Sequence, residues 1–119
     1  MCIRDRREGA PEVALGSAGS NRIRSAVLQT LLGVVDRGLG AEQAVAAPRL
    51  HVEEGRVDAE PGVDPEELNA LERDGYAVRR WSESNLYFGG VQAVARDPVT
   101  GELSGSGDPR RGGAAVSVQ

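Results

Sequence analysis

The longest regular pattern of apolar positions lies between residues 23 and 35. Apolar side chains recur there mostly at helical spacing, which is typical of one broad apolar stripe along a helix; they are Ile23, Val27, Leu28, Leu31, Leu32, Val34 and Val35. Ser20 or Asn21 is a suitable N-cap residue, and Gly38 suits the C-terminal end. We therefore predict a helix here whose apolar side is covered by other elements.

Shorter helices and strands are predicted after this helix. Residues 41–47 form a short helical pattern, and Asp64 before Pro65 is a strong start for another helix, which Gly75 ends. Strands are predicted at 49–52, 56–60, 76–78, 91–96 and from Leu103 onward, and the first two can pair as a hairpin around Gly55. This mixed order predicts an α+β fold with helices packed on one face of a largely antiparallel sheet.

The two ends of the chain lack such periodicity. Residues 1–8 are dominated by charge, and we expect a disordered or artefactual leader or a frayed natural terminus. A short apolar piece, Val13 to Leu15, opens the remaining region, 9–119, which we take as the folded part. Its glycine-rich tail from Gly105 is expected to be extended or loose.

Composition excludes several kinds of chemistry. The 119 residues make one domain at most, with 14 arginines, no lysine, 18 acidic residues and a net charge of −4. Without lysine there is neither a Walker-type phosphate loop nor a pyridoxal Schiff base. Cys2 and His51 are the only soft ligands, so we expect no metal site and no cofactor. The acidic balance argues against nucleic-acid binding, and no apolar run approaches the length that spans a bilayer.

A glycine-rich loop precedes the long helix. Gly16 to Arg22 reads Gly-Ser-Ala-Gly-Ser-Asn-Arg, and such small residues let a ligand approach the backbone closely. The free N–H groups at a helix start can hold an anion or the oxyanion of an acyl-transfer intermediate. Many such loops are only caps and turns, so the local pattern leaves both interpretations open.

This loop carries the first of several resemblances to one family. Residues 16–23 resemble the glycine loop of gamma-glutamyltranspeptidases, usually G-S-x-G-G-x-R-I. Further landmarks of that family follow in the same order, at Val27-Leu28-Gln29, Ala44 to His51 (A-V-A-A-P-R-L-H), Leu71 to Val78, Phe88 to Val94 and Gly107 to Ala114. Together they cover nearly everything from Val13 to Ala115.

The resemblance implies a fold and an activity. The family's fold is the αββα sandwich of N-terminal-nucleophile hydrolases, built from a precursor that cleaves itself into a large and a small subunit. The new N-terminal threonine attacks a gamma-glutamyl amide, commonly of glutathione, and its own amine serves as base. Some relatives hydrolyse beta-lactam acyl side chains instead. The family is often periplasmic or secreted, although the compartment of this chain is unknown.

The resemblance places this chain in the C-terminal part of the small subunit. Its only threonines, Thr30 and Thr100, do not stand in the family's nucleophile context, so we expect the chain alone to be inactive. The expected partners are a large subunit and the rest of a small subunit. The carried-over site is the backbone oxyanion hole at Gly19 and Ser20, where Ser20 replaces the family's second glycine and puts the donor geometry in doubt.

Other polar residues are predicted to be structural. We expect His51 to have a structural or partner-contact role, distant from any nucleophile, and Arg49 to form a structural ion pair. Asp108 to Arg111 is predicted to be a turn with a salt bridge, and the aromatic residues Trp81, Tyr87 and Phe88 to lie in a core or interface. The acidic set Glu53, Glu54, Asp58 and Glu60 is predicted to be a solvated hairpin face. A non-catalytic α+β interaction module and a beta-lactam acylase-like relative remain the alternatives.

Overall fold

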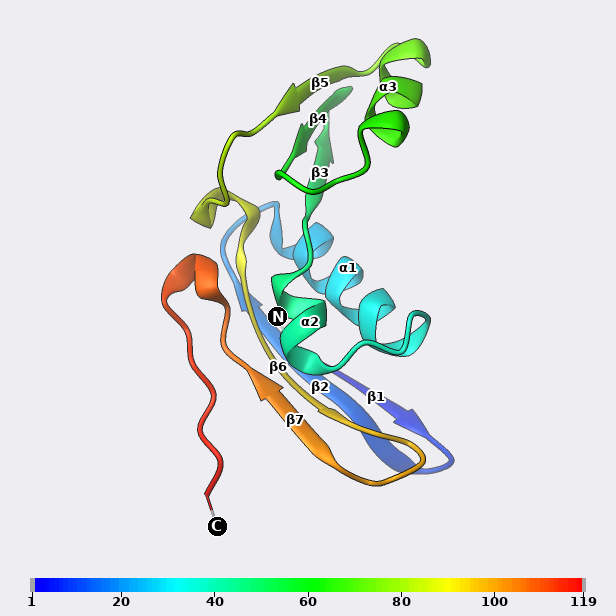
Figure 1. The fold of residues 1–119 in the computed structure, drawn as a ribbon, viewed down its shortest axis with the longest axis vertical. Coiled ribbons are helices and arrows are strands. Elements are labelled where there is room, and N and C mark those ends of the chain that lie inside the picture. Colours follow the sequence, from blue (N-terminus) through cyan, green and yellow to red (C-terminus); the bar gives the residue numbers. More distant parts are fainter. Residues whose placement is uncertain (1, 119) are drawn as a thin grey trace.

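The computed structural model describes residues 2–118, with side chains from residue 8 onward, and it contains two separate sheets (Figure 1). The larger sheet is antiparallel throughout in the order β1-β2-β6-β7, with strands β1 (Cys2–Arg7), β2 (Ala10–Ala18), β6 (Gly90–Arg96) and β7 (Leu103–Ser106). The smaller sheet has the order β3-β4-β5, with strands β3 (Leu50–Glu53), β4 (Arg56–Ala59) and β5 (Ala77–Arg80). In the smaller sheet β3 and β4 form a hairpin and β5 joins β4 in parallel.

Two helices cover one face of the larger sheet. These are α1 (Ile23–Val35) and α2 (Ala41–Ala46), and their buried side chains form the main core with inward residues of β2 and β6. That core consists of Val13, Leu15, Ala26, Val27, Val34, Ala41, Ala44, Val45, Val91, Ala93 and Ala95. The α+β prediction, with helices packed on a largely antiparallel sheet, is confirmed.

The third helix belongs to the smaller sheet. Helix α3 (Pro65–Arg73) packs Leu68 against Val57 and Ala59 of β4 and forms a second, smaller core. Asp64 caps it as predicted, accepting a hydrogen bond from the Glu66 N–H at 2.9 Å. Two short 3-10 helices, η1 (Leu86–Phe88) and η2 (Pro109–Arg111), lie where the two sheet regions meet.

The first residues form a strand that the sequence analysis did not predict. Strand β1 pairs with β2 along its length, and Glu8 (φ +51°) with Gly9 (φ +82°) makes the two-residue turn between them. An edge strand needs only backbone pairing with its neighbour, so a charged segment can form one without an apolar pattern. The expectation of a disordered stretch is therefore wrong for Cys2–Arg7, and the apolar piece at Val13 to Leu15 is part of a longer strand.

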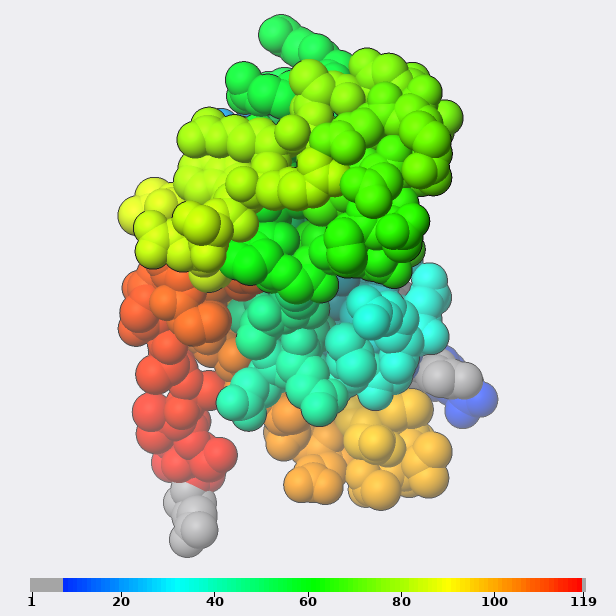
Figure 2. Space-filling model, turned by 45° about the horizontal axis from the view of Figure 1, so that its top comes forward, coloured from blue at the N-terminus to red at the C-terminus, as the bar shows by residue number. Residues whose placement is uncertain are grey.

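Two predictions about segment ends also need correction. Helix α1 begins at Ile23 with Arg22 in the N-cap position and no side-chain cap, so neither Ser20 nor Asn21 caps it. The C-terminal tail is largely irregular, and Figure 2 shows it along one side of the molecule. It is not loose throughout, because Asp108 within it is fully buried.

Candidate functional site

The glycine loop connects the end of β2 to the start of α1. Ala18 is the last residue of β2 and is paired with Gly90 of β6, and the four exposed or half-buried residues 19–22 then lead into the helix. Gly19 has φ +142°, a region that residues with a Cβ rarely adopt, whereas Ser20 has no positive φ. The backbone therefore requires glycine at position 19 and accepts serine at position 20 without strain.

Two adjacent N–H groups of this loop are free. The Ser20 carbonyl accepts a hydrogen bond from Ile23 N–H at 3.1 Å, which forms the turn into the helix. The N–H groups of Gly19 and Ser20 donate to no other group within residues 2–118. Both residues are exposed and lie just before the N-cap residue Arg22 of α1, where the positive end of the helix dipole favours a negatively charged oxygen.

Side chains of the loop fasten it to the smaller sheet and to η1. Asn21 Nδ2 donates to Glu53 Oε1 at 2.6 Å, and this hydrogen bond lowers the pKa of the Glu53 carboxyl. Arg22 Nε donates to the Tyr87 carbonyl at 3.2 Å, and its guanidinium lies 4.4 Å from the centre of the Tyr87 ring. These contacts position the loop from two sides.

His51 is buried beside α1. Its Nδ1 lies 2.7 Å from Ser25 Oγ, while its Nε2 lies 3.5 Å from Glu53 Oε2 without forming a hydrogen bond. Helix α1 brings the Ser25 hydroxyl onto β3, and this contact agrees with the structural role expected of His51. The imidazole is 3% exposed, so this contact joins the helix to the strand rather than facing a substrate.

A buried ion network lies behind the loop. Arg49 Nη1 lies 2.8 Å from Asp108 Oδ2, and Arg110 pairs through Nε with Glu60 Oε1 at 2.6 Å and through Nη1 with Asp108 Oδ1 at 3.3 Å. The two guanidinium groups also donate to the carbonyls of Val45, Ala47 and Phe88. The predicted ion pair of Arg49 and the predicted salt-bridged turn at Asp108 to Arg111 are confirmed.

The network keeps its carboxylates ionised. Burial raises the pKa of Asp108, but the Val91 N–H at 2.8 Å and the nearby Arg49 and Arg110 charges outweigh it, so the pKa lies below its usual value. Burial likewise opposes ionisation of Glu60, and hydrogen bonds from Arg110, the Arg49 N–H and Ser84 lower its pKa overall. Burial is also the main cause of the lowered pKa of Arg49.

A second buried carboxylate organises the aromatic residues. Asp58 Oδ1 accepts a hydrogen bond from Trp81 Nε1 at 2.9 Å, and its Oδ2 accepts one from the Tyr87 hydroxyl at 3.0 Å. The rings of Trp81 and Tyr87 stack with centroids 5.0 Å apart, and Phe88 packs edge-on against both. The predicted solvated acidic face is wrong for Asp58 and Glu60, which are buried. Apart from Arg56, which pairs with Asp58 at 3.2 Å, their aromatic and arginine side-chain partners lie more than 20 residues away, so local patterning carried little signal for their burial.

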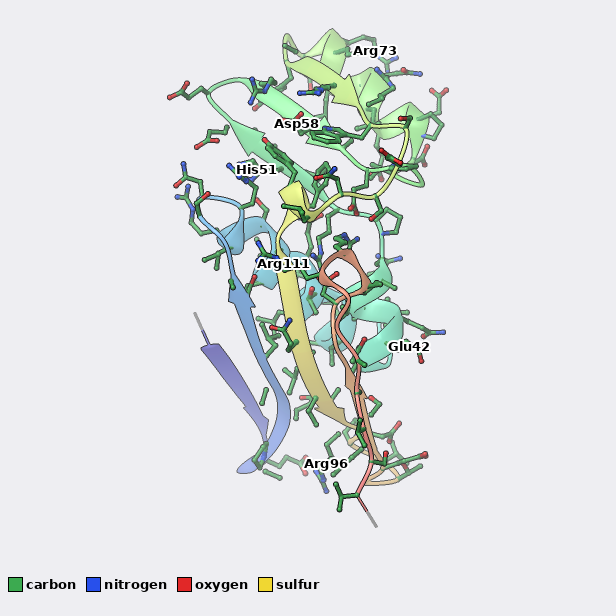
Figure 3. All side chains as sticks on the ribbon, turned by 90° about the vertical axis from the view of Figure 1, so that its left-hand side faces the viewer. Glu42, His51, Asp58, Arg73, Arg96 and Arg111 are labelled. Carbon is green, nitrogen blue, oxygen red and sulfur yellow. The ribbon has the colours of Figure 1, made fainter. Side chains whose placement is uncertain are left out.

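Adjacent arginines of η2 have opposite surroundings. Arg110 has a side chain only 3% exposed inside the ion network. Arg111 is exposed, and its guanidinium has no hydrogen bond or ion pair among the side chains described from residue 8 onward. The Arg111 side chain crosses Gly90, where a Cβ would overlap it, and its Nη2 lies 3.9 Å from the place a Cβ would take on Gly19 (Figure 3). The Arg111 guanidinium, which has no ion-pair partner among the described side chains, therefore lies beside the glycine loop.

No cluster of three potential metal ligands occurs in the described part of the chain. Among the helices between residues 2 and 118, none has the length and apolar character needed to cross a membrane. The groups available at the glycine loop are the N–H groups of Gly19 and Ser20 and the exposed Arg111 guanidinium, and the contacts of Asn21 and Arg22 hold the loop in place.

Comparisons with known proteins place these features in one family. A family model described as Gamma-glutamyltranspeptidase matches residues 1–118. The chain is 30% identical over 113 residues to the glutathione hydrolase proenzyme of Bacillus subtilis (strain 168). It is 32% identical over 112 residues to the Acylase ACY 1 proenzyme of Pseudomonas sp. (strain V22). Each match covers 94% of this chain and 19% of the relative. The gamma-glutamyltranspeptidase from Pseudomonas nitroreducens complexed with L-DON superimposes with a TM-score of 0.80 at 26% identity, over 100% of this chain and 62% of that one. The chain thus spans about a fifth of the length of these curated relatives.

Proposed function

The chain belongs to the gamma-glutamyltranspeptidase family, and from this membership we propose that it forms part of an enzyme that cleaves gamma-glutamyl amide bonds, such as that of glutathione. In this proposal the Gly19 and Ser20 N–H groups bind the oxyanion that develops on the attacked carbonyl. The acyl group is carried by an N-terminal threonine contributed by the remainder of the small subunit, and a large subunit completes the enzyme.

One observation carries the proposal: two consecutive exposed residues, Gly19 and Ser20, have N–H groups without a partner in the described residues and lie just before the N-terminus of α1. An oxyanion hole requires donors that point at the developing charge and need no rearrangement during the reaction. The loop meets the second requirement because Asn21 and Arg22 fasten it to Glu53 and Tyr87. Ser20 keeps a backbone donor in the place of the family's second glycine.

The threonines of the chain support a nucleophile from elsewhere. Thr30 is buried within α1, and Thr100 lies in the exposed turn between β6 and β7. Neither is near the glycine loop in the chain or has a free amine to act as base. We therefore expect the isolated chain to show no gamma-glutamyl hydrolysis.

A chimera tests the proposal. The 113-residue matching segment of the Bacillus subtilis glutathione hydrolase proenzyme is replaced by this chain, and hydrolysis of a gamma-glutamyl anilide is measured. Self-cleavage of the chimera into two subunits, followed on a denaturing gel, shows that it has folded. A processed chimera that hydrolyses the anilide supports the proposal, whereas a processed chimera without activity supports a non-catalytic interaction module instead.

The acylase relative defines the second substrate to test. Its identity to this chain, 32%, is close to that of the glutathione hydrolase, 30%, so the segment alone does not favour one acyl group. The same chimera is assayed with a beta-lactam that carries an acyl side chain. Faster hydrolysis of this substrate than of the anilide would assign the segment to an acylase rather than to a gamma-glutamyl enzyme.

A further inference from the structure

We propose that Arg111 is a specificity-determining residue that binds a carboxylate on the leaving group of the substrate, such as the C-terminal carboxylate of glutathione. This inference rests on the proposed function, because it places a ligand beside the proposed oxyanion hole. It concerns the part of the substrate that departs rather than the acyl group that is transferred.

The position of the guanidinium is the first support. Arg111 Nη2 lies 3.9 Å from the place a Cβ would take on Gly19, so the cation borders the loop whose N–H groups face the reacting carbonyl. An arginine presents several N–H donors in a planar fork, which matches the two oxygens of a carboxylate. A substrate held at Gly19 and Ser20 would bring a carboxylate a few bonds from the scissile amide within reach.

The absence of a competing protein anion is the second support. Arg110, next in the chain, has its charge matched by Glu60 and Asp108 and cannot serve a ligand. Arg111 has no such pairing in the described residues and is exposed. Arg22 adds a second positive charge at the same loop through its position over Tyr87. The loop is therefore bordered by two cations, and the Glu53 carboxylate beside it is bound by Asn21 rather than by Arg111.

The path of the side chain is the third support. Arg111 crosses the first residue of β6, where a Cβ on Gly90 would overlap its Cγ, Cδ and Nε. Glycine at position 90 therefore leaves the space that directs the guanidinium toward Gly19. Even a methyl group at this position would force the side chain away while the charge stayed on the protein.

The test uses the chimera and two substrates that differ only in the leaving-group carboxylate, glutathione and glutathione with its glycine amidated. We expect the parent to prefer glutathione in kcat/KM by about tenfold, the scale of one partly exposed charge-assisted hydrogen bond. Arg111→Ala should remove this preference by lowering kcat/KM for glutathione alone. Arg111→Lys should restore part of it, and Gly90→Ala should reduce it with Arg111 still present.

Controls separate this inference from the proposed function. Arg37→Ala removes another exposed arginine, beyond the C-terminal end of α1, and should leave the preference in kcat/KM for glutathione over amidated glutathione unchanged. If Arg111→Ala lowers kcat/KM equally for both substrates, its charge acts on the reacting carbonyl and the proposal is overturned. Unchanged kcat/KM values for both substrates would also overturn it. A processed parent chimera that hydrolyses neither substrate would instead overturn the proposed function, and with it this inference.

Discussion

At the scale of single residues, the buried charges were the least predictable feature. We expected Arg49 to form a structural ion pair and Asp108 to Arg111 to be a turn with a salt bridge. The sequence did not indicate that Glu60 joins them, since the Glu60–Arg110 contact spans 50 residues. Asp58 is similar, because it accepts hydrogen bonds from Trp81, which follows β5, and from Tyr87 in η1, 23 and 29 residues away. The pattern of apolar and polar positions predicts which residues of one element are exposed. It does not predict contacts with residues that are distant in the sequence.

The Asp108 side chain should be essential for stability. Asp108→Ala leaves the Arg49 charge buried without its carboxylate and removes the acceptor of the Val91 N–H. Breaking a buried pair in this way costs about 3–5 kcal/mol. Urea unfolding followed by the fluorescence of the single tryptophan, Trp81, measures the loss. Glu102→Ala, an exposed carboxylate, is the control and should change the free energy of unfolding by less than about 0.5 kcal/mol.

The same network should make the fold sensitive to acid. The pKa values of Asp108 and Glu60 are lowered in the folded chain, so their contribution to stability is complete above the unfolded carboxyl pKa of about 4 and disappears as the pH falls through the lower, folded values. The urea midpoint should therefore fall steeply below about pH 4. An equal acid dependence in Asp108→Asn would contradict the role assigned to Asp108.

Gly19 is the loop residue at which a methyl group should be harmful. Its φ of +142° is a conformation that costs about 1–3 kcal/mol for a residue with a Cβ, so Gly19→Ala should shift the loop and lower kcat in the chimera. Ser20→Ala keeps both the N–H and an ordinary φ, and its kcat should stay near that of the parent. Equal kcat values in the two variants would show that the loop conformation does not matter.

At the scale of elements, the helices were predicted better than the strands. The apolar stripe predicted the helical span of α1 but not its caps, which are Arg22 and Asp36, and Asp64-Pro65 predicted the start of α3. Strand β1 was missed because its pairing lies in the backbone rather than in an apolar pattern. The Glu8-Gly9 pair was the available signal, since Glu54-Gly55 makes the equivalent two-residue turn between β3 and β4, where the hairpin was predicted correctly.

Capping differs between the two longer helices, which gives a test. Asp64 accepts the Glu66 N–H at the start of α3, so Asp64→Ala should lower the free energy of unfolding by about 1 kcal/mol. Asn21→Ala at the start of α1 removes no cap and loses only the exposed hydrogen bond to Glu53. Urea unfolding should show the larger loss in Asp64→Ala, and the reverse order would contradict the assigned caps.

At the scale of the whole molecule, the larger sheet has one covered face and one open face. Helices α1 and α2 cover the first. The other face carries a shallow, mainly apolar groove lined by residues of β2, β6, β7 and the tail, among them Ala14, Gln92, Val94 and Gly105. Val94 is half exposed there. In the αββα sandwich of this family a second sheet packs on such a face, and we propose that the missing layer comes from the rest of the enzyme.

The isolated chain should therefore associate with itself. An open apolar sheet face favours oligomers or poor solubility, measurable by size-exclusion chromatography with light scattering. Val94→Glu places a charge on the open face and should raise the monomer fraction. Val99→Glu adds the same charge in the turn after β6, away from that face, and should not. A parent chain that is a clean monomer at all concentrations tested would contradict an exposed packing face.

The central claim is that backbone N–H groups of the glycine loop stabilise the oxyanion of a gamma-glutamyl reaction. Ser20→Pro in the chimera removes one donor, whereas Ser20→Gly keeps it and matches the family's usual residue. The decisive measurement is kcat for the gamma-glutamyl anilide in these two variants, in preparations that have cleaved themselves into two subunits. Ser20→Gly should retain the parent kcat, and Ser20→Pro should lose about 10²–10³-fold, the usual cost of one oxyanion-hole donor. A processed Ser20→Pro enzyme with undiminished kcat would contradict this claim.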